Sequence, residues 1–379
     1  MNDRRMKVLF FIPALVPGGA ERVTATLLRN LSRKRFDVSL AVVNQEGSVF
    51  SEELPSDIPI IDLQASRLRF ALFKILRLIW NTQPDVVFST IDYLNVTLGA
   101  TRRLWPRRTR FIARPTILFS AALQENRQPS LWRALTKMAL ASTDLLVFQS
   151  SAMEQDYRKS LDWRNGSATV IPNPLDLDLV RKQAMSGADE PDFDPSAFNI
   201  VAAGRLEEQK GFDLAIEAVA ALRNKDVHLT ILGEGSRRTM LESLVREKNI
   251  KDRVRLIGYR HNPYPYYAKA DGFLLSSKFE GFPNVVLEAL SCGTPVIATP
   301  VAGLSTILEN IPQCEISSGH RISELSEAID RFVSRGRQKV DSSVIDRFDA
   351  RLVVLRYEEL FENVASSQAR VGRNWSLAR

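Results

Sequence analysis

The sequence contains little cysteine and little histidine. Only two cysteines, Cys292 and Cys314, occur in 379 residues, which is too few for a disulfide framework and predicts a reducing compartment. The three histidines, His228, His261 and His320, fall on separate predicted elements and lack the spacing of a zinc site. We therefore expect no metal centre and no metal cofactor.

Long apolar runs are also absent. No run reaches the roughly 20 residues that span a bilayer. Arg4, Arg5 and Lys7 precede the apolar run 8–17 as in a signal peptide, but no small-x-small cleavage site follows, and 18–22 resembles the opening of a helix. The prediction is a soluble or peripheral protein without a cleaved leader.

The chain is too long for one typical core, so two domains are expected. It has 45% hydrophobic and 25% charged residues and shows neither internal repeats nor low-complexity tracts. Residues 1–175 contain 24 Lys and Arg against 15 Asp and Glu, whereas the remainder contains 27 against 29. The basic half either meets an acidic partner or serves solubility.

The first half alternates strand-like apolar runs with amphipathic helical patterns. The strand-like runs are 7–13, 37–44, 58–63, 85–90, 110–115, 144–150 and 168–172. The helical patterns are 20–33, 68–82, 92–104, 130–142 and 151–159. This alternation predicts a mostly parallel sheet covered on both faces, with ligands at the C-terminal ends of its strands.

Gly18 and Gly19 stand between the first predicted strand and the first predicted helix. Two glycines there would let a ligand approach the backbone and leave N–H groups free, although a plain tight turn has the same sequence. No G-x-G-x-x-G fingerprint follows the strand, so a dinucleotide-dependent oxidoreductase is poorly supported.

The segment 66–80, SRLRFALFKILRLIW, predicts a basic amphipathic helix. Phe70, Phe73 and Trp80 fall at the seam between its cationic face and its Leu/Ile face. A helix on an anionic membrane surface has this pattern, and so does a helix that packs on a core. Arginines cluster nearby at 102–110; nucleic acid is the rival partner for this charge, but no recognisable nucleic-acid motif supports it.

Asp176 and Asp178 match the D-x-D pattern that binds a divalent metal in some sugar-nucleotide enzymes. Aspartates are also routine at turns and helix starts, and this second interpretation is favoured. The Pro-rich and polar stretch 175–197 is interpreted as an interdomain linker.

A second α/β pattern begins at 198 and predicts a second parallel domain of about 150 residues. Arg205 and Lys210 stand between its first strand and first helix, where two cations can hold a diphosphate. Surface charge in a loop that also contains Glu207 and Glu208 is the competing explanation.

The most informative stretch is 279–299, FEGFPNVVLEALSCGTPVIAT. Glu280 follows the strand-like run 272–277, Pro283 suits the first turn of a helix, and Gly293 ends that helix after Glu288. A helix N-terminus can hold an anion, and a carboxylate beside it would face hydroxyl groups. Together they predict a site for a sugar nucleotide.

The segments AGRLEEQKGFDLAIEA, ILGEG and SSKFEGFPNVVLEALSCGTPVIATPVAG resemble the family 4 retaining glycosyltransferases, as do GGAERV at 18–23 and VIPNPLDLD at 170–178. The fold that this implies is α/β of the GT-B type, with two doubly wound Rossmann-like domains facing each other across a cleft. The expected domains are an acceptor-binding one over 1–180 and a nucleotide-sugar-binding one over 181–349. A last helix at about 350–366 would pack back on the first.

The resemblance implies a donor site built from Gly18, Gly19, Gly204, Arg205, Lys210, Tyr259, Arg260, Glu280, Gly281, Phe282, Pro283, Asn284, Val285, Val286 and Glu288. Arg205 and Lys210 would bind the diphosphate, helped by the Gly19 N–H and the helix start at 284–286. Glu280 would lie against the donor sugar and Glu288 against the ribose hydroxyls. The turn at 259–260 would border the base.

Arg205, Lys210 and Glu280 are the predicted catalytic residues. Negative charge grows on the diphosphate as the anomeric bond breaks, so fixed cations there stabilise the transition state more than the ground state. Retention is explained in this family by attack on the face of departure, with a leaving-group oxygen taking the acceptor proton. Glu280 would therefore orient the sugar and offset positive charge at the anomeric carbon, with neither a side-chain base nor a metal required.

The sequence also departs from the family pattern. Many relatives place a histidine-bearing loop after the fifth strand, whereas here the strand ends Ala113-Arg114-Pro115-Thr116-Ile117, and no histidine precedes His228. Arg114 remains the candidate acceptor contact.

The resemblance is to bacterial enzymes that build lipopolysaccharide cores, capsules, exopolysaccharides and lipid-linked glycans. It implies transfer of a hexose or N-acetylhexosamine, with a UDP-sugar as donor, at the cytoplasmic face of the inner membrane. A nucleotide-sugar epimerase or hydrolase on the same fold, and a non-catalytic nucleotide-sugar-binding subunit, are the alternatives.

Overall fold

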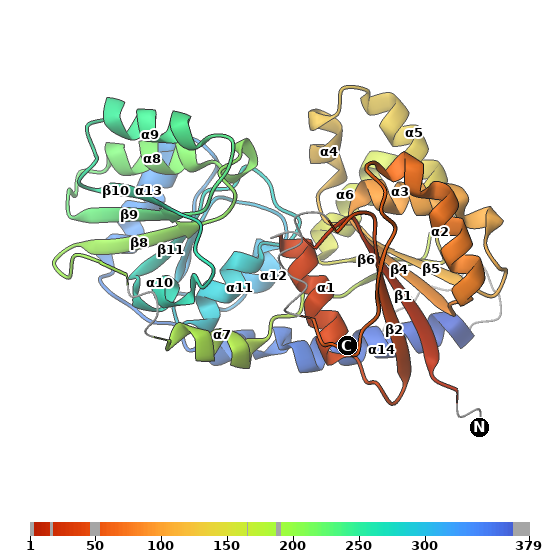
Figure 1. Ribbon diagram of the computed structural model, residues 1–379. Coiled ribbons are helices and arrows are strands. Elements are labelled where there is room, and N and C mark those ends of the chain that lie inside the picture. Colours follow the sequence, from red (N-terminus) through yellow and green to blue (C-terminus); the bar gives the residue numbers. More distant parts are fainter. Residues whose placement is uncertain (1–3, 16–17, 46–53, 165, 187–190, 367–379) are drawn as a thin grey trace. The chain divides into compact units, whose positions relative to one another are not determined.

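The protein divides into two compact units. Unit 1 comprises Met1–Pro174 and Ala350–Arg379, and unit 2 comprises Leu175–Asp349. The computed structural model describes residues 4–15, 18–45, 54–164, 166–186 and 191–366 (Figure 1). The boundary falls at Pro174–Leu175 rather than between 180 and 181, and the last helix belongs to unit 1.

Unit 1 contains a seven-stranded sheet with the order β3-β2-β1-β4-β5-β6-β7. Every strand pairing in it is parallel. The strands are β1 (Met6–Ile12), β2 (Phe36–Val42), β3 (Ile60–Asp62), β4 (Val86–Thr90), β5 (Arg110–Arg114), β6 (Leu145–Phe148) and β7 (Ala168–Val170). The helices are α1 (Gly19–Asn30), α2 (Leu68–Thr82), α3 (Asp92–Thr101), the 3-10 helix η2 (Arg102–Leu104), α4 (Phe119–Glu125), α5 (Pro129–Leu140), α6 (Ser151–Leu161) and α14 (Ala350–Ser366).

Unit 2 contains a six-stranded parallel sheet with the order β10-β9-β8-β11-β12-β13. The strands are β8 (Phe198–Ala203), β9 (Val227–Leu232), β10 (Val254–Gly258), β11 (Gly272–Leu275), β12 (Val296–Ala298) and β13 (Glu315–Ile316). The helices are α7 (Leu177–Ala184), the 3-10 helix η4 (Glu208–Lys210), α8 (Phe212–Ala221), α9 (Arg238–Glu247), α10 (Tyr264–Lys269), α11 (Asn284–Ser291), α12 (Leu304–Leu308), α13 (Ile322–Ser334) and the 3-10 helix η5 (Ser342–Phe348).

Both sheets are doubly wound. In each, the chain moves outward from the first strand in one direction and then crosses to the other side of it. The strand order therefore reverses between β1 and β4 in unit 1 and between β8 and β11 in unit 2. Ligands of such sheets bind outside the carboxyl ends of the strands at these switch points, which fixes where a site is to be sought.

The helix α14 completes the core of unit 1, although it lies at the far end of the chain (Figure 1). Phe361 is fully buried, and its ring lies 6.1 Å from that of Phe10, 6.1 Å from that of Phe36 and 5.7 Å from that of Phe88. A cluster on the other face of the sheet, which includes Ala71, Ile75 and Ile79 of α2, buries the strands there. Both faces of the sheet are thus covered.

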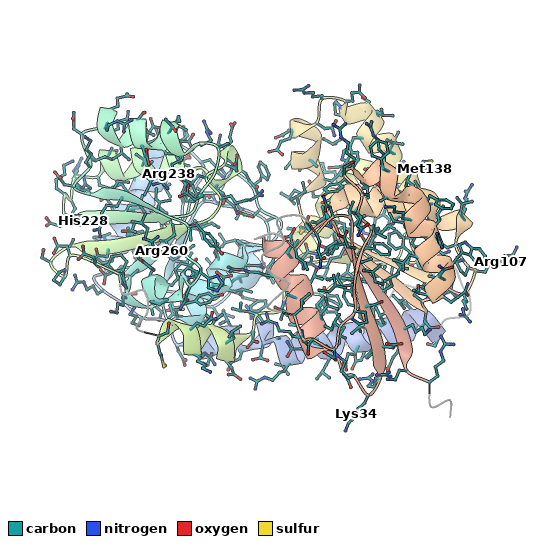
Figure 2. All side chains as sticks on the ribbon, viewed as in Figure 1. Lys34, Arg107, Met138, His228, Arg238 and Arg260 are labelled. Carbon is teal, nitrogen blue, oxygen red and sulfur yellow. The ribbon has the colours of Figure 1, made fainter. Side chains whose placement is uncertain are left out.

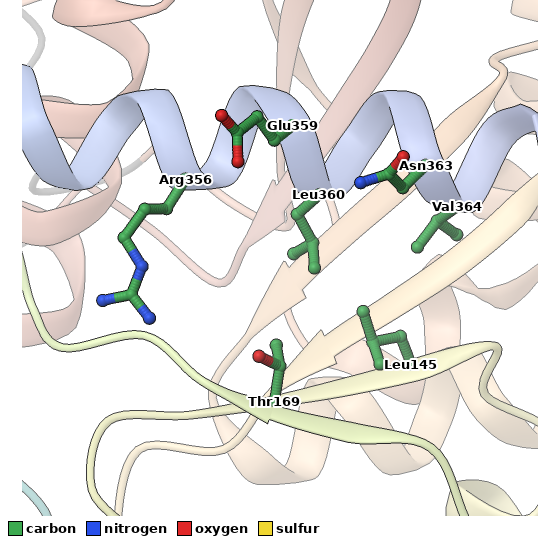
Figure 3. A pocket seen from close by; sticks show the side chains of 7 residues that line it. All are labelled: Leu145, Thr169, Arg356, Glu359, Leu360, Asn363 and Val364. Carbon is green, nitrogen blue, oxygen red and sulfur yellow. The ribbon is translucent and has the colours of Figure 1, made fainter. Parts of the chain in front are cut away.

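A small pocket remains between α14 and the strands β6 and β7 (Figure 3). Its lining consists of Leu145, Thr169, Arg356, Glu359, Leu360, Asn363 and Val364. Beside it, Arg356 Nη2 donates to the Val170 carbonyl at 2.8 Å. None of the predicted site residues lines this pocket, which belongs to the packing of the last helix on the sheet edge.

The predicted alternation of strands and helices is confirmed, and the helix predicted at 68–82 has those bounds as α2. The linker predicted at 175–197 is wrong for its first part, because α7 forms there, with Leu177 and Val180 buried in the core of unit 2. Residues 187–190 of that stretch lie outside the described residues. No element is predicted above for α4, α12, β13 or α13.

No helix in the described part of the chain has the length and apolar composition needed to cross a bilayer. The apolar run 8–17, which resembles the core of a signal peptide, contributes most of β1, a central strand paired with both β2 and β4.

We expect the two buried thiols of unit 2 to make the protein less stable at alkaline pH. Burial raises the pKa of Cys292 to about 12 and that of Cys314 to about 11, against about 8.5 for an unfolded thiol. Above about pH 8.5 the unfolded chain loses these protons while the folded chain keeps them. The free energy of unfolding therefore falls as pH rises, by about 1 kcal/mol for each thiol at one pH unit above that value.

Urea unfolding at neutral and alkaline pH measures this change. The double variant Cys292→Ala, Cys314→Ala is the control, because it removes both groups and should flatten the alkaline part of the profile. An unchanged alkaline slope in that variant would show that the thiols are not its source.

Candidate active site

Two loops meet at the switch point of unit 2. One follows β8 and contains residues 204–211, and the other follows β11 and contains residues 276–283. β8 and β11 are neighbours in the sheet, with Gly272 paired to Ile200 and Phe273 to Val201. Because the pairing is parallel, both loops emerge at the same edge of the sheet, although about seventy residues separate them in the sequence.

Hydrogen bonds join the two loops. Ser276 Oγ donates to the Lys210 carbonyl at 2.8 Å, and the Lys278 N–H donates to the Gln209 carbonyl at 2.8 Å. Gly211 makes this approach possible: its φ is +60°, and a Cβ there would lie 2.2 Å from the Ser276 carbonyl oxygen. A larger residue would meet both a steric clash and an unfavourable backbone conformation.

An ion pair links Lys210 to Glu280 across the loops. Lys210 Nζ donates to Glu280 Oε1 at 2.6 Å, and Ser277 Oγ donates to the same oxygen at 2.7 Å. The two charged side chains are only 19% and 9% exposed. Thr299 Oγ1 donates to the Ser277 carbonyl at 2.6 Å and so fixes the residue that orients Glu280. The carboxylate is thus held through one oxygen by two donors.

Arg205 differs from Lys210 in its surroundings. Its side chain is exposed, and among the described residues its guanidinium forms no ion pair. Arg205 therefore presents an exposed cation beside the same loop. An exposed guanidinium with a forked set of donors can bind a phosphate oxygen pair without first losing a carboxylate partner.

The N-terminus of α11 forms the other side of the loop after β11. Pro283 is its N-cap residue, and the first turn, Asn284 to Val286, contains no acidic side chain. Gly281, Phe282 and Pro283 are buried, whereas Asn284 and Val285 are partly exposed. The first N–H groups of a helix lack partners within it and favour an anion. The predicted Gly281–Val286 segment thus has the backbone geometry expected of an anion site.

Glu288 and the 259–260 turn occupy different positions. Glu288 lies on α11 and is 4% exposed, so its carboxylate is nearly closed to solvent in this structure. Tyr259 is 45% exposed, and Arg260 Nε donates to the Tyr266 hydroxyl at 3.2 Å. Both residues of the turn follow β10, which β9 and β8 separate from β11 in the sheet order (Figure 2). The roles of these residues toward ribose and base stay predictions.

The remaining predicted donor residues lie in two places. Gly204 follows β8 directly, and its N–H donates to the Leu232 carbonyl at 3.0 Å. Gly18 and Gly19 belong to unit 1, where Gly18 is the N-cap of α1 and Gly19 its first residue. The predicted helix start is confirmed there. A contribution of the Gly19 N–H to a shared donor site stays a prediction.

Arg114, the acceptor candidate, is 2% exposed at the end of β5. Its guanidinium donates to Thr90 Oγ1 at 3.1 Å and to Asn173 Oδ1. This arrangement gives Arg114 a structural partner set that ties the ends of β4 and β5 to the segment after β7. The structure lends no support to a direct acceptor contact.

A second polar group that sequence reasoning missed lies at the switch point of unit 1. Asp92 begins α3, and it accepts hydrogen bonds from the Tyr157 hydroxyl and from the Thr116 N–H, the latter at 3.3 Å. Burial raises the pKa of Asp92 although these donors act against the rise. The signal available in the sequence was an aspartate two residues after the end of the predicted strand 85–90.

No metal-binding cluster is found among the described residues, whether of histidine, cysteine, aspartate or glutamate. Asp176 of the D-x-D pattern is the N-cap of α7, and its side chain accepts from the Leu179 N–H at 3.0 Å. The interpretation of Asp176 as a helix-start residue is therefore confirmed. Figure 2 shows His228, at the start of β9, toward the opposite end of the sheet from Arg260.

Comparison with known proteins identifies the family. The profile described as Glycosyltransferase Family 4 matches residues 17–179, and that described as Glycosyl transferases group 1 matches residues 197–335. An N-acetylgalactosamine-N,N'-diacetylbacillosaminyl-diphospho-undecaprenol 4-alpha-N-acetylgalactosaminyltransferase of Campylobacter jejuni is 32% identical over 303 residues, which cover 77% of this chain and 80% of that protein. The chain belongs to the family 4 glycosyltransferases.

Further relatives of this glycosyltransferase match shorter stretches or the fold alone. The lipopolysaccharide core biosynthesis glycosyltransferase LpsE of Rhizobium meliloti is 39% identical over 104 residues, covering 27% of this chain and 30% of that protein. The crystal structure of Anabaena HepE in complex with UDP-glucose has a TM-score of 0.76 at 19% identity, with 95% of this chain and 100% of that one covered. The fold of this glycosyltransferase is accordingly GT-B.

Sequence reasoning found Lys210 and Glu280 but missed the residues that hold them, Ser276, Ser277 and Gly211. The two serines end the predicted strand-like run 272–277, four and three residues before Glu280, and that position was the available signal. The hydrogen bond from Ser277 to Glu280 could not be predicted, because it depends on the turn that the loop makes after β11.

We expect Ser277→Ala to lower kcat of the glycosyltransferase about tenfold or more while the donor KM changes little. The variant removes one of the two donors that orient Glu280, and a hydrogen bond to a charged group contributes about 1.5–3 kcal/mol. Ser277→Thr keeps the hydroxyl and should restore most of the rate. Steady-state kinetics with varied donor measure the two constants separately.

The matched control is Ser326→Ala in the same unit. Ser326 is also buried, and its Oγ donates to the Ala218 carbonyl at 3.0 Å in the helix layer. Equal losses of kcat in the two alanine variants would show that Ser277 acts through stability alone.

Proposed function

We propose that this glycosyltransferase transfers a hexose or an N-acetylhexosamine from a nucleotide sugar to a glycan or lipid-linked glycan acceptor, in bacterial surface polysaccharide synthesis. A UDP-sugar is the proposed donor. The observation that carries the proposal is the arrangement of Lys210, Glu280 and the α11 N-terminus at the switch point of unit 2. It brings together a cation, a carboxylate and a helix N-terminus, the groups that a nucleotide diphosphate and a sugar would need.

The relatives support the substrate classes. The Campylobacter relative is named as a transferase of N-acetylgalactosamine to a diphospho-undecaprenol-linked glycan, and it aligns with most of this chain. The HepE structure was determined with UDP-glucose. A lipid-linked acceptor and a uridine nucleotide are therefore the first substrates to test on this chain.

We assign the reaction a retaining course without a metal. Arg205, Lys210 and the α11 N-terminus supply the positive charge that a divalent cation would otherwise supply to the departing diphosphate. Attack from the face of departure lets a diphosphate oxygen take the acceptor proton. Glu280 then has no proton to transfer, and its carboxylate orients the sugar hydroxyls and offsets charge at the anomeric carbon.

We place the reaction at the cytoplasmic face of a membrane, where a lipid-linked acceptor and a soluble nucleotide sugar are both accessible. Two free cysteines accord with a reducing compartment. How unit 1 would approach such a membrane is considered in the next subsection.

Lys210→Ala should lower the transfer rate about 100-fold to 1,000-fold, the range for losing one donor to a developing oxyanion. Lys278→Ala is the control: Lys278 lies in the neighbouring loop, but its Nζ contacts Glu208 at 2.9 Å and its side chain is 41% exposed. Rates under saturating donor measure the difference. Wild-type turnover in the Lys210 variant would remove Lys210 from the mechanism.

A donor panel tests the substrate class and the reaction type together. Thermal shift with UDP-, GDP- and ADP-sugars should show a rise of the melting temperature with the UDP-sugar, since a ligand stabilises the folded state by RT ln(1 + [L]/Kd). The same donor is then incubated with and without an undecaprenyl-diphosphate-linked glycan. Sugar transfer only with acceptor supports the proposal, whereas acceptor-independent turnover identifies an epimerase or a hydrolase. Binding without turnover identifies a non-catalytic subunit.

A further inference from the structure

The helix α2 has two apolar faces, and only one of them is buried. Ala71, Ile75 and Ile79 face the sheet and are fully buried. On the opposite side Phe70, Phe73 and Trp80 are 58%, 74% and 53% exposed. The sequence pattern of this helix therefore fits both of the explanations given for it: Ala71, Ile75 and Ile79 pack on the core, while the aromatic residues remain in solvent.

The exposed aromatic residues share one stripe with two cations. At 100° per residue, Arg69, Phe70, Phe73, Arg77 and Trp80 fall within an arc of about 100°. The guanidinium of Arg69 lies 4.8 Å from the centre of the Phe70 ring. This stripe runs along the outer side of α2 and is not needed to cover the core of unit 1.

The stripe continues onto the segment after α3. Trp80 Nε1 donates to the Leu104 carbonyl at 2.8 Å, which fixes η2 beside the end of α2. Leu104 is 59% exposed, and the neighbouring arginines 103, 107 and 108 are exposed as well. We define the α2 surface by the following residues: Arg69, Phe70, Phe73, Arg77, Trp80, Arg103, Leu104, Arg107 and Arg108 (Figure 2 labels Arg107).

The charge of the α2 surface is entirely positive. Segments 66–82 and 101–110 together contain nine Lys and Arg and no Asp or Glu. Two of the nine, Arg102 and Arg110, pair with Asp144 at 3.3 and 3.2 Å behind the surface. Within the described part of the chain, the five arginines of the α2 surface form no ion pair. Their charge is therefore available to an external anion.

We propose that the α2 surface docks on the headgroup region of an anionic phospholipid bilayer, with Phe70, Phe73, Trp80 and Leu104 inserted among the headgroups. Aromatic side chains favour the membrane interface, and arginines beside them gain from anionic lipid. A protein interface is a poorer match, because the centres of such interfaces are depleted in charge. The docking proposal rests on the proposed function in one respect: a lipid-linked acceptor would explain why the enzyme binds a membrane.

Vesicle co-sedimentation of the full chain tests the docking without donor, acceptor or turnover. The protein should pellet with vesicles of phosphatidylcholine and phosphatidylglycerol at low salt, remain in solution with phosphatidylcholine alone, and be released by high salt. A protein that stays in solution with the anionic vesicles at low salt overturns the proposal.

Paired variants separate insertion from simple charge attraction. Phe70→Ser, Phe73→Ser should weaken binding to the anionic vesicles about tenfold or more. The control Leu352→Ser, Leu355→Ser changes two leucines that are 53% and 52% exposed on α14, and it should bind as the wild type does. Equal losses in both pairs would overturn the assignment to the α2 surface.

A second pair of variants, which reverse single charges, tests the electrostatic part of the binding. Arg107→Glu should weaken vesicle binding about fivefold or more, and Lys34→Glu, which alters an exposed cation elsewhere on unit 1, should not (Figure 2). Loss in the arginine variant with full binding in the phenylalanine variant would show charge attraction without insertion of the aromatic side chains, and would overturn the proposal.

Activity on a short, water-soluble acceptor distinguishes this proposal from the proposed function. The phenylalanine variant should retain that activity and lose activity on acceptor embedded in anionic vesicles. A wild type that binds vesicles but transfers no sugar would leave the docking standing and refute the transfer.

Discussion

The parallel pairing of β8 with β11 is the constraint on which the candidate site depends. β8 is the first strand of its sheet in chain order and β11 the fourth, and their adjacency is what reverses the strand order. Since both strands end at the same edge, the loop carrying Lys210 and the loop carrying Glu280 meet there. Gly211 then determines how closely they meet, because only a residue without a side chain fits against Ser276. The chemistry of the site follows from this backbone arrangement rather than from either loop alone.

Unit 1 depends on a different long-range contact. The chain leaves this unit at Pro174 and returns at Ala350, and the returning helix buries Phe361 against rings on β1, β2 and β4. Arg35 Nη1 also pairs with the buried carboxylate of Glu358 at 2.7 Å. The core of unit 1 is therefore complete only when both ends of the chain are present. Unit 2 is one continuous segment and needs no such closure, so the two units differ in how much of the chain must be made before each can fold.

The sequence was sufficient for most of the elements and for singling out Lys210 and Glu280, and insufficient for the residues that hold these two side chains. β-branched runs and amphipathic periods predict the alternation of strands and helices, and α2 has its predicted bounds. The helix α7 was missed because Pro174 and the polar residues after 184 resemble a linker, although its N-cap, Asp176, was noticed.

The helix α2 also shows that a local sequence pattern does not determine tertiary contacts. The periodicity of 66–80 predicts an amphipathic helix but cannot decide which of two apolar stripes meets the sheet. Burial of Ile75 and Ile79 decides it, and leaves Phe73 in solvent. Likewise, Arg114 ends β5 at the sheet edge where ligands of such folds bind, yet its hydrogen-bond partners, Thr90 and Asn173, are far away in the sequence. Such tertiary partners are set by sheet order, which local patterns do not encode.

The pairing of Lys210 with Glu280 defines what each residue can do. Removing one member of a largely buried ion pair typically costs about 3–5 kcal/mol, so before a donor binds the pair keeps both charges compensated. In the proposed donor complex, a diphosphate at Lys210 would add a second anion to a cation with further donors to offer, and Arg205 would share its charge. Glu280 would keep its hydrogen bonds from Lys210 and Ser277 at Oε1 in this complex. A carboxylate that an ammonium and a hydroxyl hold through one oxygen has a fixed position and leaves its other oxygen for a further contact. This geometry suits the proposed role of a residue that orients sugar hydroxyls.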